Sequence, residues 1–279
     1  MKPSPSAATE KRLLFAMGGG GFTMEPGNPL LDDFVLSLAP PGLREPRILF
    51  LPTASGDTTA QINAFYARFS SRMCVPEHLP LFRLQEIERP LEELVLSQQI
   101  VYVGGGSMRN LLAIWRAHGL DSLLIEAWRR GIVLAGLSAG AMCWFQGGVT
   151  RSSGPPTAIA GLGLLEGSLT VHADGEPERL PVWLASVRDG TLPGGWAVDD
   201  GVGLLFSGSR LRRIVSSRPG AGAQRVDAIA GELVRARLEP ELLGAGEHGA
   251  APLDEDIQEL RRVQRLRRGI TRERGIRDP

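Results

Sequence analysis

The sequence is poor in cysteine, carries no net charge and has no long apolar run. Cys74 and Cys143 are its only cysteines, too few for a disulfide framework or a zinc cluster, which favours a reducing compartment and no metal site. Lysine plus arginine and aspartate plus glutamate both number 31, so no excess of charge indicates a nucleic acid or an anionic membrane as partner. The apolar run at residues 13–17 is far too short for a signal-peptide core or a membrane span. We therefore expect a cytoplasmic protein whose partners are small.

Short apolar runs alternate with helical patterns over the first half of the chain, as they do in βαβ units. We expect strands at residues 13–17, 47–52, 99–103 and 132–137. Helices are expected at residues 110–118 and 122–130, with Asp121 as the N-cap of the second. With 43% hydrophobic residues among 279, the chain can bury one sizeable core. The pattern predicts an α/β fold with a mostly parallel, doubly wound sheet.

The second half of the chain is richer in loops. Strand-like pieces at residues 169–171, 202–206 and 213–215 indicate that the same sheet continues, and residues 221–252 have the pattern of an edge strand and a surface loop. We expect one α/β domain over residues 1–252, followed by a charged helical extension over residues 253–279. A helix at residues 254–274 would have its acidic residues first and its arginines later, which suits the helix dipole, and its apolar stripe is thin.

Three loops rich in small residues follow the carboxyl ends of predicted strands, at residues 18–21, 104–107 and 136–141. Open α/β sheets bind their ligands at this edge, so we expect the functional site there. The first loop lacks both the Gly-Lys-Ser/Thr ending of a P-loop and a complete G-x-G-x-x-G, so nucleotide binding is weakly supported.

The third loop contains the pattern G-x-S-x-G, with Ser138 between Gly136 and Gly140. An apolar strand precedes it and a helix-compatible stretch follows. The glycines relieve crowding at a sharp turn that exposes the hydroxyl, and the helix N-terminus offers N–H groups to a developing oxyanion. The pattern also occurs in ordinary tight turns, but this context favours Ser138 as a nucleophile.

A serine nucleophile needs a base, and the chain has only four histidines. His172 ends a strand-like piece, opens a turn and lies downstream of the serine, as in many hydrolases. His78 lies in a loop-to-strand passage, His118 at the end of a helical pattern and His248 in a region rich in glycine and alanine. Position therefore favours His172.

Several separate motifs occur in order along the chain. They are YVGGGSMRNLL at 102–112, WRAHGLD at 115–121, GLSAGAMCWF at 136–145, GLGLL at 161–165, HADGEPER at 172–179 and VDDG at 198–201. Together they resemble the peptidase E family of serine peptidases, family S51, which includes aspartyl dipeptidases and, more distantly, cyanophycinases. The likeness spans most of residues 13–225, and it implies a flavodoxin-like fold of the class I glutamine amidotransferase type.

The resemblance also implies roles for individual residues. It makes Ser138 the nucleophile, His172 the base, and the N–H groups of Gly106 and Ala139 the oxyanion hole. No cofactor is expected, because acyl transfer through serine and histidine needs none. The implied partner is a small peptide substrate, and a homodimer is compatible with the likeness.

The third member of a triad is less determined. Some family members carry an aspartate shortly after the serine, but this chain has Arg151 there, and a cation cannot stabilise an imidazolium. Other members place an acid after a later strand, which corresponds here to Asp200 or, one residue away, Asp199. Asp174 and Glu176 are the remaining alternatives, and we prefer Asp200.

Substrate-binding residues are assigned from the same resemblance. The family's Asn-Thr pair after the triple glycine is replaced, and Ser107 is the small polar residue left there to contact substrate. An aspartyl dipeptidase needs a cation for the side-chain carboxylate of its substrate, and arginine geometry suits that task. Arg179 is the preferred candidate, with Arg109 and Arg151 as alternatives.

The leading interpretation is a serine peptidase that hydrolyses short peptides, among them N-terminal aspartyl dipeptides, through an acyl-enzyme at Ser138. One alternative makes Cys143 the nucleophile, but this residue falls inside the helix after the turn, where burial is more common. A second alternative is a catalytically silent binding protein of the same fold, which Arg151 keeps in consideration. A third is another amide hydrolase of the cyanophycinase type.

Overall fold

The computed structural model describes residues 12–244. The chain divides into two compact units, residues 1–243 and 244–279, and the described residues lie almost wholly in the first. The helix expected at residues 254–274 lies outside the described residues, and the domain boundary expected at residue 252 stays a prediction.

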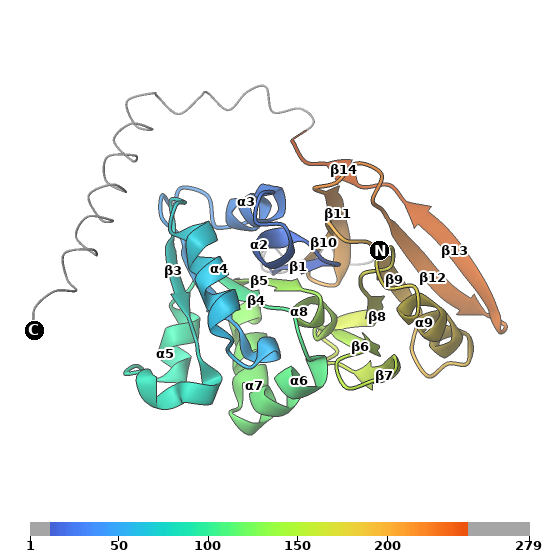
Figure 1. Cartoon of the computed structure of the whole chain (residues 1–279), viewed down its shortest axis with the longest axis horizontal. Coiled ribbons are helices and arrows are strands. Elements are labelled where there is room, and N and C mark those ends of the chain that lie inside the picture. Colours follow the sequence, from blue (N-terminus) through green and yellow to red (C-terminus); the bar gives the residue numbers. More distant parts are fainter. Residues whose placement is uncertain (1–11, 245–279) are drawn as a thin grey trace, which may run out of the picture. The chain divides into compact units, whose positions relative to one another are not determined.

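The first sheet has eight strands in the order β14-β11-β10-β1-β5-β4-β2-β3 (Figure 1). Five neighbouring strands, from β3 to β1, are parallel, whereas β10 pairs antiparallel with both β1 and β11. The strands are β1 (Leu13–Met17), β2 (Arg47–Leu51), β3 (Val75–His78), β4 (Ile100–Val103), β5 (Val133–Leu137), β10 (Val202–Ser207), β11 (Arg210–Ser216) and β14 (Glu241–Leu242). The predicted fold class, α/β with a mostly parallel sheet, is confirmed.

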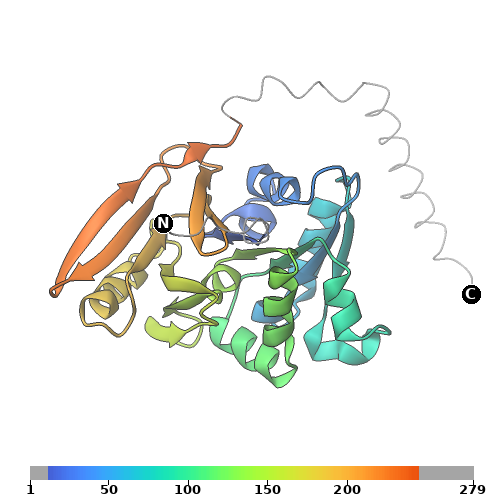
Figure 2. The same cartoon turned by 180° about the vertical axis from the view of Figure 1, so that it is seen from behind.

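Helices cover both faces of this sheet, because its strands are apolar on both sides (Figures 1 and 2). Phe15 and Phe50 pack on one face with α2 (Gly21–Met24), α3 (Leu30–Ser37) and α4 (Thr59–Phe69). Leu14 and Leu49 pack on the other face with α5 (Leu91–Leu96), α6 (Met108–Ala117) and α7 (Leu120–Arg129). Successive strand residues therefore supply two separate cores, as the period-two alternation of a strand dictates.

The chain also forms a second sheet, which the sequence analysis did not predict. Its order is β13-β12-β9-β8-β6-β7. The strands are β6 (Phe145–Thr150), β7 (Thr157–Ala160), β8 (Leu165–Thr170), β9 (Gly195–Val198), β12 (Ala223–Ile229) and β13 (Glu232–Leu238). Helix α9 (Arg179–Arg188) packs on it through Trp183 and Val187. The expectation that residues 169–171 continue the first sheet is wrong, whereas 202–206 and 213–215 do continue it.

Two local expectations need correction. Asp121 does not cap the helix after Gly119: α7 begins at Leu120, and Gly119 stands before it with a left-handed φ of 66°. Glycine adopts that conformation without strain, so it separates two helices without a capping side chain. In the stretch 221–252, β13 is the expected edge strand, but residues 223–229 form a second strand, β12, instead of loop, and the two pair along seven residues in a hairpin that turns at Ala230 and Gly231.

In the part of the chain that the structure describes, no helix combines the length and the apolar character needed to cross a bilayer.

Candidate active site

Ser138 occupies a strained turn between β5 and the short helix α8 (Ala139–Met142). Its backbone has φ 54° and ψ −112°, a conformation that non-glycine residues rarely adopt. The turn requires its flanking glycines, because a Cβ on Gly136 would lie 1.9 Å from the carbonyl oxygen of Gly140, and one on Gly140 would lie 2.5 Å from that of Val103. The turn is held by the Ser138 N–H, which donates to the Met17 carbonyl at 3.0 Å.

The triple-glycine loop after β4 lies beside this turn. Gly106 has φ 141°, and a Cβ there would stand 2.2 Å from the carbonyl oxygen of Ala54, so only glycine fits. Gly106 lines the same cavities as Ser138. Ala139 is the first residue of α8, a position whose N–H has no partner within its helix. The two N–H groups assigned to an oxyanion hole therefore come from loops that meet at Ser138.

His172 follows β8 and faces Ser138. Its Nε2 lies 2.9 Å from Ser138 Oγ. His172 also has a positive φ of 54°, and its carbonyl accepts hydrogen bonds from the N–H groups of Gly175 and Glu176 at 3.1 and 2.8 Å. The tight turn His-Ala-Asp-Gly therefore directs the imidazole away from the strand and toward the serine.

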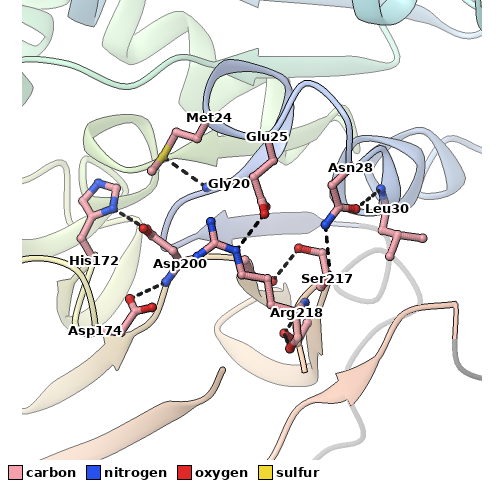
Figure 3. A network of polar contacts seen from close by, with 12 residues as sticks. Gly20, Met24, Glu25, Asn28, Leu30, His172, Asp174, Asp200, Ser217 and Arg218 are labelled. Atoms are coloured by element: carbon pink, nitrogen blue, oxygen red, sulfur yellow. Dashed lines mark hydrogen bonds and ion pairs between the residues drawn. The ribbon is translucent and has the colours of Figure 1, made fainter. Parts of the chain in front are cut away.

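Asp200 follows β9 and faces the other nitrogen of the same ring. Its Oδ1 lies 2.5 Å from His172 Nδ1 (Figure 3). Asp174 stands behind it and accepts a hydrogen bond from the Asp200 N–H at 2.9 Å. Asp199 points elsewhere, since its Oδ2 accepts from the Gly222 N–H at 2.9 Å. Of the acids considered from the sequence, Asp200 is thus the one that the structure brings to the imidazole.

The charges around Asp200 keep it ionised. Burial raises the pKa of this carboxyl, but the hydrogen bond and charge of His172, followed by the guanidinium groups of Arg218 and Arg179, bring the pKa below its ordinary value. Arg218 Nε is held by Glu25 Oε1 at 2.8 Å, and Figure 3 shows this pair beside Asp200. Neither residue could be identified from the sequence, because they lie 193 positions apart and form no local motif.

Two cavities meet at the candidate triad. The first has a volume of about 470 Å³, and its lining includes Thr23, Met24, Gln61, Gly105 and Asp200. The second has a volume of about 380 Å³, and its lining includes Met142, Thr150, Arg151, Ser152 and Arg179. Four residues line both cavities: Gly106, Ser138, His172 and Glu176. We call the second the arginine cavity. Thr23, Met24 and Gln61 belong to no sequence motif, so their place in the cavity could not be predicted.

The arginine candidates separate clearly. Arg179 is buried and Arg151 half-exposed, both in the wall of the arginine cavity, whereas Arg109 is exposed on α6 and lines neither cavity. Ser107 also lines neither cavity: its Oγ accepts from the Asn110 N–H at 3.2 Å as the N-cap of α6, and from the Ser152 hydroxyl at 3.0 Å.

The remaining nucleophile and base candidates are placed elsewhere. Cys143 is fully buried at the end of α8, where burial raises the pKa of its thiol well above the ordinary value and its Sγ donates to the Gly140 carbonyl. His78 pairs with the Tyr66 hydroxyl at 2.9 Å, and His118 caps the exposed end of α6. His248 lies outside the described residues. Within residues 12–244, no group of three or more histidine, cysteine, aspartate or glutamate side chains is arranged to hold a metal ion.

Comparisons with known proteins agree on one family. The sequence profile of peptidase family S51 matches residues 14–214. The chain is 46% identical over 231 residues to an uncharacterized peptidase, YgaJ, of Bacillus subtilis, which covers 83% of this chain and 99% of that protein.

Two solved structures share the fold. One is a peptidase from an acI-B1 actinobacterium, with a TM-score of 0.56 and 18% identity over 81% of this chain and 96% of that chain. The other is a putative peptidase E protein from Listeria monocytogenes, with a TM-score of 0.50 and 19% identity over 81% of this chain and 98% of that chain. The profile match and the 46% identical relative lead to the same conclusion: the chain belongs to peptidase family S51.

Proposed function

We propose that the protein is a serine peptidase that hydrolyses short peptides through an acyl-enzyme at Ser138. The observation that carries the proposal is the line of contacts from Ser138 Oγ to His172 Nε2 at 2.9 Å and from His172 Nδ1 to Asp200 Oδ1 at 2.5 Å. A serine, an imidazole and a carboxylate in this order are the parts that acyl transfer requires.

Each residue then has a defined task. His172 Nε2 accepts the hydroxyl proton while Ser138 Oγ attacks the scissile carbonyl carbon, and the Gly106 and Ala139 N–H groups stabilise the oxyanion. The C–N bond breaks as His172 returns the proton to the leaving amine. Water then hydrolyses the acyl-enzyme with His172 again as the base. Asp200 holds the imidazole in the required tautomer and stabilises its positive charge.

N-terminal aspartyl dipeptides are the substrate class we propose. Arg179 lines the arginine cavity with Ser138, and its guanidinium suits a carboxylate on the acyl side of the scissile bond. Arg151 does not place a cation against the imidazole, since it pairs with Glu176 and Glu178 rather than with His172. We further propose a cytoplasmic location, where the free thiols of Cys74 and Cys143 stay reduced.

Hydrolysis of Asp-Leu, Glu-Leu, Leu-Leu and β-Asp-Leu by the wild type and by Ser138→Ala tests the proposal. We expect cleavage of Asp-Leu that depends on Ser138. Equal cleavage by Ser138→Ala would overturn the role of the serine. Preference for β-Asp-Leu would favour an amide hydrolase of the cyanophycinase type. No cleavage of any peptide by pure, folded protein would favour a silent binding protein.

A further inference from the structure

An ion pair forms part of the wall of the arginine cavity. Arg179 Nη2 lies 2.9 Å from Glu176 Oε2, and both residues line the cavity together with Ser138. The N–H of Arg179 donates to the Glu176 carbonyl at 3.0 Å, so the two side chains leave the backbone within one turn. The N–H of Glu176 in turn donates to the His172 carbonyl. The pair is therefore held at a fixed place relative to the candidate base.

Arg179 has hydrogen-bond donors that the Glu176 carboxylate does not use. Only 7% of the Arg179 side chain is exposed, and among the described residues its Nε and Nη1 have no hydrogen-bond partner. Burial lowers the pKa of Arg179, with Glu176 acting in the opposite direction. Burying a hydrogen-bond donor without an acceptor costs free energy. The donors of Arg179 are therefore satisfied only when a ligand brings an acceptor into the cavity.

The carboxylate of the pair is placed to reach a substrate too. Glu176 lines both cavities that meet at Ser138, and 28% of its side chain is exposed. It is shared between two cations, since Arg151 Nη1 lies 3.5 Å from the same Oε2 that faces Arg179. Since Arg151 also pairs with Glu178, Arg179 keeps a partner for only one of its guanidinium nitrogens, and Glu176 is the one carboxylate among the described residues that line the arginine cavity.

A peptide that begins with aspartate carries the opposite pattern. Its α-ammonium group and its side-chain carboxylate flank the same carbon, next to the carbonyl that the serine attacks. We propose that Glu176 binds the α-ammonium group of the substrate while Arg179 binds the side-chain carboxylate. The internal ion pair is exchanged for two ion pairs with the substrate. A free N-terminus is then a requirement, and Glu176 is the residue that imposes it. This inference rests on the proposed function.

The experiment compares Asp-Leu with N-acetyl-Asp-Leu, which lacks the ammonium charge. The wild type is expected to hydrolyse Asp-Leu about 100-fold more efficiently, a ratio in the range found when one partner of a desolvated charge pair is lost. Glu176→Gln is expected to lower kcat/KM for Asp-Leu by about the same factor, chiefly through KM, and to leave N-acetyl-Asp-Leu within a few-fold of its wild-type rate.

Glu178→Gln is the matched control. Glu178 also faces Arg151, at 3.8 Å, but 69% of its side chain is exposed and it lines neither cavity. It is expected to keep the wild-type ratio between the two peptides. The rate at which a fluorophosphonate labels Ser138 reports whether the serine and histidine remain aligned, independently of peptide binding.

The outcomes separate this inference from the function on which it rests. Efficient, Ser138-dependent cleavage of N-acetyl-Asp-Leu by the wild type would overturn the inference and leave the peptidase proposal standing. Loss of fluorophosphonate labelling in Glu176→Gln would also overturn it, because the residue would then serve to position His172. Cleavage that persists in Ser138→Ala, or no cleavage at all, would remove the proposed function and the inference with it.

Discussion

Gly19 lies directly against the carboxylate of Asp200. A Cβ at position 19 would stand 1.8 Å from Asp200 Oδ1 and 2.9 Å from His172 Nδ1. Because Gly19 has no side chain, the loop after β1 leaves the space in which the imidazole and the carboxylate meet. This explains why glycine stands at position 19.

Replacing Gly19 is accordingly expected to disable the site. In Gly19→Ala the added methyl group displaces Asp200 from His172, and kcat should fall by about 10³-fold or more, as when the acid of a triad is lost. Gly27→Ala is the control, because a Cβ there meets nothing within 4 Å. Steady-state kinetics with Asp-Leu measure this effect. A wild-type kcat in Gly19→Ala would show that catalysis does not require Asp200 at its position beside His172.

The two neighbouring aspartates are expected to differ sharply. Asp200→Asn should lower kcat by about 10⁴-fold, because asparagine at this position stabilises the wrong imidazole tautomer. Asp199→Asn should have little effect on kcat, since Asp199 bonds the Gly222 N–H instead. Kinetics on both variants decide the matter, and a larger loss in Asp199→Asn would contradict the assignment.

Arg179 is expected to determine the preference for an acidic residue. Arg179→Met should raise KM for Asp-Leu so that kcat/KM falls by about 100-fold, with a much smaller effect on cleavage of Leu-Leu. Arg109→Met, which changes an exposed arginine of α6 outside the cavities, is the control. An unchanged ratio of Asp-Leu to Leu-Leu hydrolysis in Arg179→Met would contradict this role.

Arg218 is expected to influence the acidic limb of the pH profile. Its positive charge contributes to the lowered pKa of Asp200. Without it, Asp200 holds its proton up to higher pH, so the acidic limb of kcat/KM should move to higher pH in Arg218→Met. Arg130→Met removes an exposed ion pair on α7 and should leave the limb in place. Coincident profiles for Arg218→Met and the wild type would contradict this account.

Asp32 is expected to make stability depend on pH. Burial raises its pKa to about 7, against the opposing charge of Arg68 and the hydrogen bonds from the Phe22 N–H and the Tyr102 hydroxyl. The folded state therefore holds a proton that the unfolded state releases near pH 4, so this contribution is present at low pH and is lost as pH rises toward 7.

Between pH 5 and pH 8 the wild type should lose about 2 kcal/mol of unfolding free energy relative to Asp32→Asn, which cannot titrate. Urea denaturation of both proteins at the two pH values measures this difference. An identical change in both proteins would show that Asp32 does not titrate in this range.

The strands and loops that end at the site could be predicted because each has a local sequence pattern that specifies its structure. An apolar run followed by small residues, as at Gly104 and Gly136, has few alternative structures. The second sheet could not be predicted in this way. Strands β6 and β8 mix buried glycine and serine with glutamine and glutamate, so they show neither a continuous apolar run nor a clear alternation.

Residue-level choices had similar limits. Asp199 and Asp200 are adjacent residues of the same type after the end of β9, so the preference for Asp200 rested on the resemblance to the family, and the fold was needed to show which of them faces His172. Glu25 and Arg218 meet only through the fold. The sequence shows only that Arg151 stands where some family members carry an aspartate. The structure shows that its ion-pair partners are Glu176 and Glu178 in the loop before α9.

The most direct measurement of the central claim is mass spectrometry of the protein after reaction with a fluorophosphonate. We predict one adduct, on the peptide that contains Ser138, formed rapidly by the wild type and at least about 100-fold more slowly by His172→Ala. An adduct on another residue, or an unlabelled Ser138 in protein that still cleaves Asp-Leu, would contradict it.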